Sequence, residues 1–254
     1  MTVRQGFYQA AIAGVVDKTE DGYEKVQRMY AKLRREKILP WDWIDDYTRW
    51  RRKPTTDNSL ADAIKRTAEH YRRALWQSAD AYVEVWLEKD ALAGVIYPVT
   101  QTYDVPLMVA RGYSSLSFLY GAAEHIAGLR KPAYIFHLGD HDPSGVNAAK
   151  KIEETLSELA PDAEIHFERL AVLPWQISEW NLPTRPTKQS DSRAKAFGYA
   201  DSVELDAIHP DRLRDLVEQA ILRHISEYEI EVLQVAEEYE REALMSFHRD
   251  LSAR

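Results

Sequence analysis

The chain has 254 residues, 45% of them hydrophobic and 29% charged, with a formal net charge of −8. This length suits one large domain or two small ones, and the apolar fraction is sufficient for a packed core, so a disordered chain is excluded. There is no cysteine, which excludes disulfides and thiolate zinc sites and agrees with a reducing compartment.

The sequence contains no membrane or export signal. No stretch approaches 18 uninterrupted apolar residues, and the N-terminus has no apolar signal region. We therefore expect a soluble, cytoplasmic protein without a membrane partner.

Charge is distributed unevenly along the chain. Residues 1–73 contain 16 Lys and Arg against 11 Asp and Glu, whereas the remainder contains 17 against 30. The first third is therefore suited to phosphate backbones, although a solvated helix face gives the same balance.

The N-terminal region has two predicted helices. The first spans residues 2–13 and stops at Gly14; the second spans 20–37, with apolar residues at helical spacing. The second helix is basic, and its candidate DNA-binding residues are Arg28, Lys32, Arg34 and Arg35. Two helices with a tight connection indicate a helix-turn-helix, with 38–44 as a wing or edge strand, although ordinary helical domains share the pattern.

A basic stretch follows at residues 49–54. Arg51 and Arg52 stand here beside Trp50, and cations mixed with an aromatic residue suit contacts to phosphates and bases. A solvated turn is the alternative. A connecting helix is expected over residues 58–78.

From about residue 80 the chain alternates between strand-like and helix-like segments. We expect strands over 81–87, 105–110, 133–138 and 163–172, and helices over 91–99, 114–127 and 145–159. This alternation predicts right-handed crossovers and a mostly parallel, Rossmann-like sheet. After Pro210 an amphipathic helical region runs to the C-terminus.

Acidic residues stand where two of these strands end. Asp140 and Asp142 follow the third strand, and Glu88 ends the first. Parallel strands bring such ends to one edge of the sheet, and neighbouring carboxylates repel unless a cation neutralises them, so the three predict a Mg²⁺ site. The alternative is a turn that only ends the strand. Ser144 is expected to cap the next helix.

Other polar residues surround this motif. His141 stands between the two acids; it either supports them, shifts the metal preference toward Mn²⁺, or is an ordinary loop residue. Lys188 and Arg193 lie in a Pro- and Ser/Thr-rich loop that either contacts DNA or is solvated. Glu204 and Asp206 either lie near the metal edge or cap the next helix; we expect Asp206 to be a cap and leave the role of Glu204 open.

Several of these motifs together resemble the Toprim domain of the topoisomerase VI A subunit and the related meiotic double-strand-break protein. The matching segments, in family order and approximate spacing, are Glu88-Lys89-Asp90-Ala91, Arg111-Gly112-Tyr113 and Asp140-His141-Asp142-Pro143-Ser144-Gly145. In that family a winged-helix domain with an Arg-Asp-x-Tyr-Tyr-like motif precedes the Toprim domain. Here Arg4-Gln5-Gly6-Phe7-Tyr8 stands in that place, with Gln5 for the acid and Phe7 for the first tyrosine.

The resemblance implies a fold and an activity. The fold is a winged-helix domain over 1–75, followed by a Toprim domain with C-terminal helices over 76–254. The activity is Mg²⁺-dependent DNA cleavage, and possible rejoining of the strands, by a small stand-alone protein of the sort that phages and mobile elements encode. Tyr8 is then the nucleophile, Arg4 stabilises the phosphate, Asp140 and Asp142 hold the metal, and Glu88 binds metal or transfers a proton.

The resemblance also implies partners. The substrate is double-stranded DNA, so the expected location is DNA in the cytoplasm, that of the host if a phage encodes the protein. A homodimer brings the tyrosine of one protomer to the metal site of the other. The chain has no Gly-x-x-x-x-Gly-Lys-Ser/Thr loop, so ATP-driven strand passage requires a separate ATPase partner. The rival hypotheses are a Toprim nuclease that uses metal-activated water and a non-catalytic DNA-binding module with a structural ion.

Overall fold

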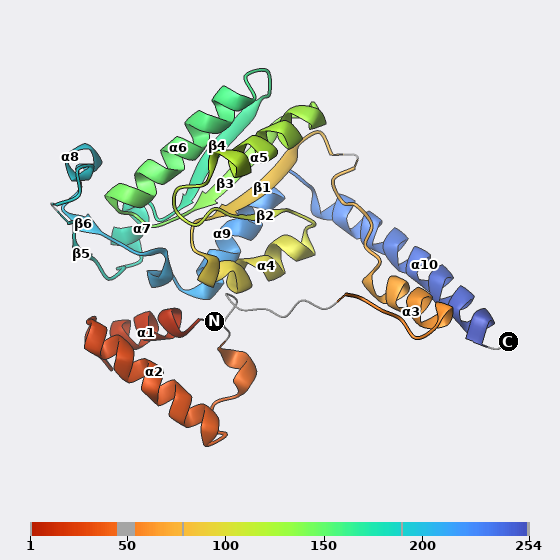
Figure 1. Ribbon diagram of the computed structural model, residues 1–254, viewed down its shortest axis with the longest axis horizontal. Coiled ribbons are helices and arrows are strands. Elements are labelled where there is room, and N and C mark those ends of the chain that lie inside the picture. Colours follow the sequence, from red (N-terminus) through yellow and green to blue (C-terminus); the bar gives the residue numbers. More distant parts are fainter. Residues whose placement is uncertain (1, 45–53, 78, 189, 253–254) are drawn as a thin grey trace. The chain divides into compact units, whose positions relative to one another are not determined.

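A computed structural model describes residues 2–44, 54–77, 79–188 and 190–252 (Figure 1). The chain forms two compact units, one from residues 1–49 and 80–220 and the other from 50–79 and 221–254. These units cut across the predicted division into 1–75 and 76–254, because the N-terminal helices group with the sheet.

The core of the first unit is a parallel four-stranded sheet in the order β2-β1-β3-β4. Its strands are β1 (Tyr82–Leu87), β2 (Leu107–Val109), β3 (Ala133–Leu138) and β4 (Ile165–Ala171). The central strands β1 and β3 are almost wholly buried, as expected for a parallel sheet covered on both faces. The predicted parallel sheet is confirmed.

Three helices connect the four parallel strands. They are α4 (Ala93–Thr102), α5 (Leu116–Leu129) and α6 (Pro143–Leu159). Figure 1 shows α5 and α6 running across the sheet, where Leu119, Ile126 and Ile152 pack on Trp86 and Ile135. From β1 the chain crosses to β2 at one edge of the sheet. From β3 it crosses in the opposite direction, to β4 at the other edge. The topological switch point therefore lies between the carboxyl ends of β1 and β3, where open α/β sheets bind ligands.

The chain after β4 contains short elements that sequence patterns did not predict. They are α7 (Pro174–Glu179), the antiparallel pair β5 (Arg185–Pro186) and β6 (Asp201–Ser202), α8 (Ala194–Phe197) and the 3₁₀ helix η3 (Leu205–Ala207). A two-way backbone bridge between His141 and Val203 ties this segment to the loop after β3. It thereby brings η3 to the switch point. The predicted helical region after Pro210 begins with α9 (Pro210–Leu222).

The N-terminal region contains the two predicted helices, α1 (Val3–Ile12) and α2 (Glu20–Arg35). Thr2 and Gln5 form a capping box that starts α1. The helices pack closely, because a Cβ on Gly6 would collide with the Tyr30 ring. The expected wing or edge strand over 38–44 was wrong: these residues form no strand and contain the 3₁₀ helix η1 (Trp41–Trp43).

The second unit pairs α3 (Leu60–His70) with the long helix α10 (Glu227–Ser252). Its ion pairs centre on Glu237, which accepts from the Arg73 backbone at 2.8 Å and from Arg241 at 2.5 Å. The helix expected over 58–78 ends earlier, at His70. In the part of the chain that the structure describes, no helix is long and apolar enough to span a membrane.

Candidate functional site

Glu88 and Asp140 meet at the switch point. Leu87 and Leu138 are register partners at the ends of β1 and β3. Glu88 therefore lies beside the segment Gly139-Asp140 that follows β3. The Asp140 backbone N–H donates to Glu88 Oε2 at 3.0 Å. Gly145 is needed beside them, because a Cβ there would lie 2.5 Å from the Asp140 carbonyl oxygen and 3.0 Å from Glu88 Oε2.

Asp142 begins helix α6. Its side chain accepts from the Gly145 N–H at 2.8 Å, with Pro143 as the first helical residue. The expectation that Ser144 is the cap was therefore wrong; Ser144 lies in the first turn, and its hydroxyl donates to Asp191 at 3.3 Å. The second Asp142 oxygen lies 3.5 Å from Arg185. Asp142 thus holds the helix and keeps one oxygen facing a cation.

The ammonium of Lys89 lies among three carboxylates. Its Nζ is 3.0 Å from Asp140, 3.2 Å from Glu204 and 2.7 Å from Asp206. The structure therefore places Glu204 at the sheet edge. Asp206 is fully buried within η3 and bonded to Lys89, so the expectation that it caps a helix was wrong.

The pKa values of Glu88, Asp140 and Lys89 all lie above their ordinary values, whereas the cations around Glu204 lower the pKa of that carboxyl against its burial. Burial, reinforced by Asp140, raises the pKa of Glu88. Burial also raises the pKa of Asp140, although Lys89 opposes it. Burial alone would lower the pKa of Lys89, but Asp206, Asp140 and Glu204 outweigh it and raise that pKa. Lys89 therefore stays charged, and the protein itself supplies part of the neutralisation that sequence reasoning assigned to a metal.

Two arginines complete this neutralisation. Arg169, from β4, donates through Nη2 to the Gly139 carbonyl at 2.9 Å and to the Asp140 carbonyl. Arg185, from β5, reaches Glu204 at 3.2 Å. Sequence reasoning missed both. Arg169 could have been found as a charged residue that immediately precedes the buried, apolar end of β4.

The acids have the chemistry of a hard-metal site but not a ready-made geometry. Carboxylate oxygens are the ligands that Mg²⁺ prefers, and Glu88, Asp140 and Asp142 supply them at one edge. Among the residues that the structure describes, no group of three or more His, Cys, Asp or Glu is arranged to hold an ion. The residue types therefore fit Mg²⁺, and binding requires side-chain movement around Lys89 and Arg185.

Tyr8 and Arg4 lie beside the same acids in the same chain. Arg4 Nε is 3.5 Å from Glu204 Oε2. Tyr8 is 2% exposed, its ring stands edge-on to Phe7, and Lys18 Nζ lies 5.2 Å from its ring centre. Burial, and then Glu204, raise the pKa of Tyr8, with Lys89 and Arg4 opposing. The phenol is therefore close to the site and protonated. Its approach to a partner's metal site stays a prediction.

His141 packs against two aromatic rings. It is 3% exposed and packs against the rings of Phe197 and Tyr199, both with centroids 4.8 Å away. Burial, with help from Arg169, lowers the pKa of His141 to about 4. This packing favours a structural role in the loop.

The predicted DNA-binding residues of α2 are engaged in local contacts. Arg28 donates to the Glu24 carbonyl, Lys32 lies 3.8 Å from Glu36, and Arg34 stacks on Trp41. Arg35 is exposed at the end of the helix. Their role toward DNA stays a prediction.

The predicted DNA-binding residues of the loops differ from one another. Arg193 is bound to Asp191, with Nε 2.8 Å from Oδ1, and it also donates to the Tyr113 hydroxyl at 2.5 Å. Lys188 is exposed. Arg51 and Arg52 lie outside the described residues. Lys188 is thus the described loop cation best placed to meet a phosphate.

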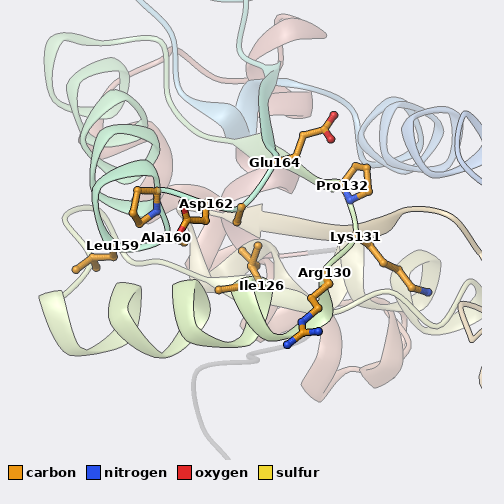
Figure 2. A pocket seen from close by; sticks show the side chains of 11 residues that line it. Ile126, Arg130, Lys131, Pro132, Leu159, Ala160, Asp162 and Glu164 are labelled. Carbon is orange, nitrogen blue, oxygen red and sulfur yellow. The ribbon is translucent and has the colours of Figure 1, made fainter.

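A hollow of about 610 Å³ lies at the opposite edge of the sheet. Ile126, Leu159 and Ala160 form its base, with Arg130 and Glu164 at its rim (Figure 2). The charged ends of Arg130, Lys131 and Glu164 point away from one another in Figure 2. The hollow therefore has volume without convergent chemistry.

Comparison of the chain with protein-family models, curated proteins and solved structures finds no match.

Proposed function

We propose that this protein cleaves DNA strands by metal-dependent tyrosine transesterification, in the manner of the topoisomerase VI A subunit. The observation that supports this most is the meeting of Glu88 and Asp140 at the topological switch point of a parallel sheet. A second support is that Tyr8 and Arg4, about 80 residues or more before these acids in the sequence, lie on the same cluster through Glu204.

Each residue has a role in this reaction. Glu88, Asp140 and Asp142 would hold Mg²⁺, which supplies positive charge to the phosphate oxygens when bound. Arg4 stabilises the same negative charge. The Tyr8 hydroxyl gives its proton to water, and its oxygen attacks phosphorus to form a 5′-phosphotyrosyl bond while the bond to the 3′ oxygen breaks. Where Glu88 does not bind the metal, it donates the proton that the departing 3′ oxygen takes up, and its raised pKa suits that step.

A Toprim nuclease that uses metal-activated water is the second candidate. It is favoured by the state of Tyr8, which is buried and whose pKa is raised, so that its phenolate is disfavoured. This reaction leaves free 5′-phosphate ends and no protein–DNA bond. The two candidates share the acids and differ only in the nucleophile.

The proposal extends to partners. A homodimer would supply two tyrosines for the two strands of DNA. Passage of one duplex through another would need a separate ATPase, whereas cutting or relaxation would not. The proposed location is DNA in the cytoplasm.

The decisive assay incubates supercoiled plasmid with the protein and Mg²⁺, followed by detergent. We expect DNA covalently joined to protein, lost in Tyr8→Phe and kept in Tyr23→Phe, a matched control because Tyr23 also packs edge-on to Phe7. Cleavage that persists in Tyr8→Phe without any adduct would contradict the tyrosine mechanism and support the nuclease.

A further inference from the structure

Lys89 has the surroundings of a coordinated cation. It is the second residue after β1 and reaches into a cluster whose acids come from the loop after β3 and from η3 with the residue before it. Its three carboxylate neighbours lie 2.7–3.2 Å from Nζ. An ammonium has three N–H donors, so Asp140, Glu204 and Asp206 use all of them. The cluster thus already holds one cation, which is covalently part of the chain.

Asp206 has an oxygen that this lysine does not use. The residue is 0% exposed, Oδ2 accepts from Lys89, and Oδ1 has no hydrogen-bond partner among the described residues. A buried carboxylate oxygen without a partner is costly. An ion that accepts more ligands than an ammonium could engage this spare oxygen.

The same acids suit a divalent ion once the lysine is gone. Mg²⁺ binds oxygen at about 2.0–2.1 Å, so each carboxylate would move inward by roughly 1 Å from its present distance to Nζ. Glu204 would keep neutralising contacts with Arg4 at 3.5 Å and Arg185 at 3.2 Å. The present spacing, set by the larger ammonium, explains why the cluster does not have metal geometry as it stands.

We propose that Asp140, Glu204 and Asp206 form a divalent-cation site that Lys89 occupies with its own ammonium. The protein thereby fills a second cation position beside the metal proposed at Glu88, Asp140 and Asp142. This site shares Asp140 with the proposed metal site, and its role in catalysis rests on the proposed function. The occupancy itself can be measured without any activity assay.

The test counts Mn²⁺ ions bound by the full chain in calorimetric titrations of wild type and Lys89→Ala. We expect Lys89→Ala to bind one more Mn²⁺ than wild type. The matched control Lys150→Ala removes a lysine that pairs with Glu154 at 3.7 Å on an exposed helix face, and it should bind as many ions as wild type. Asp206→Asn added to Lys89→Ala should abolish the gain.

The outcomes separate this inference from the proposed function. A folded Lys89→Ala that binds the same number of ions as wild type overturns the inference. If wild type binds none and Lys89→Ala binds one, the inference holds and the proposed metal at Glu88 fails. If Lys89→Ala is unfolded in chelator, circular dichroism should show that Mn²⁺ restores the fold; a chain that stays unfolded with Mn²⁺ overturns the inference.

Discussion

The two ends of strands β3 and β4 carry similar residue types in opposite states. At the carboxyl end, Asp140, Lys89 and Arg169 are largely buried and contact one another or the backbone. At the amino end, Arg130 and Glu164 are exposed around a hollow of about 610 Å³. Charged side chains converge at the carboxyl end and not around this hollow.

This difference shows that buried, mutually contacting charges are a better guide to chemistry here than cavity volume. Desolvation makes such charges expensive to keep, so they persist only where each is compensated. Perturbed groups of this kind concentrate at functional sites. The following predictions compare the two ends directly.

The largest difference should appear in DNA cleavage. Asp140→Asn removes a proposed metal ligand and should lower the Mg²⁺-dependent cleavage rate by at least about 100-fold. Asp162→Asn, at the opposite end, should leave the rate unchanged. Plasmid nicking measured over time checks both; equal rates for Asp140→Asn and wild type would remove Asp140 from the chemistry.

A smaller but clear difference is expected in stability when one arginine is removed at each end. Arg169→Met removes the side-chain donor of the Asp140 carbonyl and one of the two donors of the Gly139 carbonyl, which keeps the Val172 N–H at 2.7 Å, and it should lower the free energy of unfolding by about 1–3 kcal/mol. Arg130→Met should change it by less than about 0.5 kcal/mol, since Arg130 is exposed. Urea unfolding checks this; equal effects would break the distinction between the two ends.

Glycine substitutions should separate the ends further. Gly145→Ala forces a Cβ against the Asp140 carbonyl and should cost about 1–2 kcal/mol. Gly128→Ala, in α5 near the hollow, meets nothing within 4 Å and should stabilise the helix by up to about 1 kcal/mol. Thermal unfolding of both variants tests the pair, and a Gly145→Ala protein as stable as wild type would contradict the close packing at the switch point.

The smallest effect concerns pH. Burial and Asp140 raise the pKa of Glu88 in the folded state above its ordinary value of 4.5. The folded metal-free protein therefore holds this proton more tightly than the unfolded chain, and stability from Glu88 is lost as pH rises from 4.5 through the raised pKa. The difference in unfolding free energy between wild type and Glu88→Gln should fall over that window. A difference independent of pH would show that the pKa of Glu88 is not raised.

Much of the fold followed from sequence pattern. The apolar runs of β1 and β3, the Pro132 and Gly139 boundaries of β3 and the intervening helices predicted a parallel sheet, and parallel strands then required Glu88 and Asp140 to share an edge. Short elements were not predictable in this way. Segments such as β5, β6 and η3 have two or three residues each, too few to show a period.

The cations around the acids were also beyond sequence pattern. Lys89 and Arg169 look like ordinary charged residues in the chain, and only the tertiary fold brings Glu204 and Asp206 to Lys89 across more than 100 residues. Asp142 shows the limit at short range, because the sequence predicted Ser144 as the helix cap, whereas Asp142 is the cap in the structure. The sequence argument saw acids that needed a cation but could not see cations of the protein's own.

The central claim is that the switch point between β1 and β3 binds a divalent ion. It is tested most directly by anomalous X-ray diffraction from crystals of the protein soaked in Mn²⁺. The account predicts an anomalous peak within bonding distance of carboxylate oxygens of Glu88 and Asp140. A peak at the opposite end, beside Asp162 and Glu164, with none at the switch point, would contradict it.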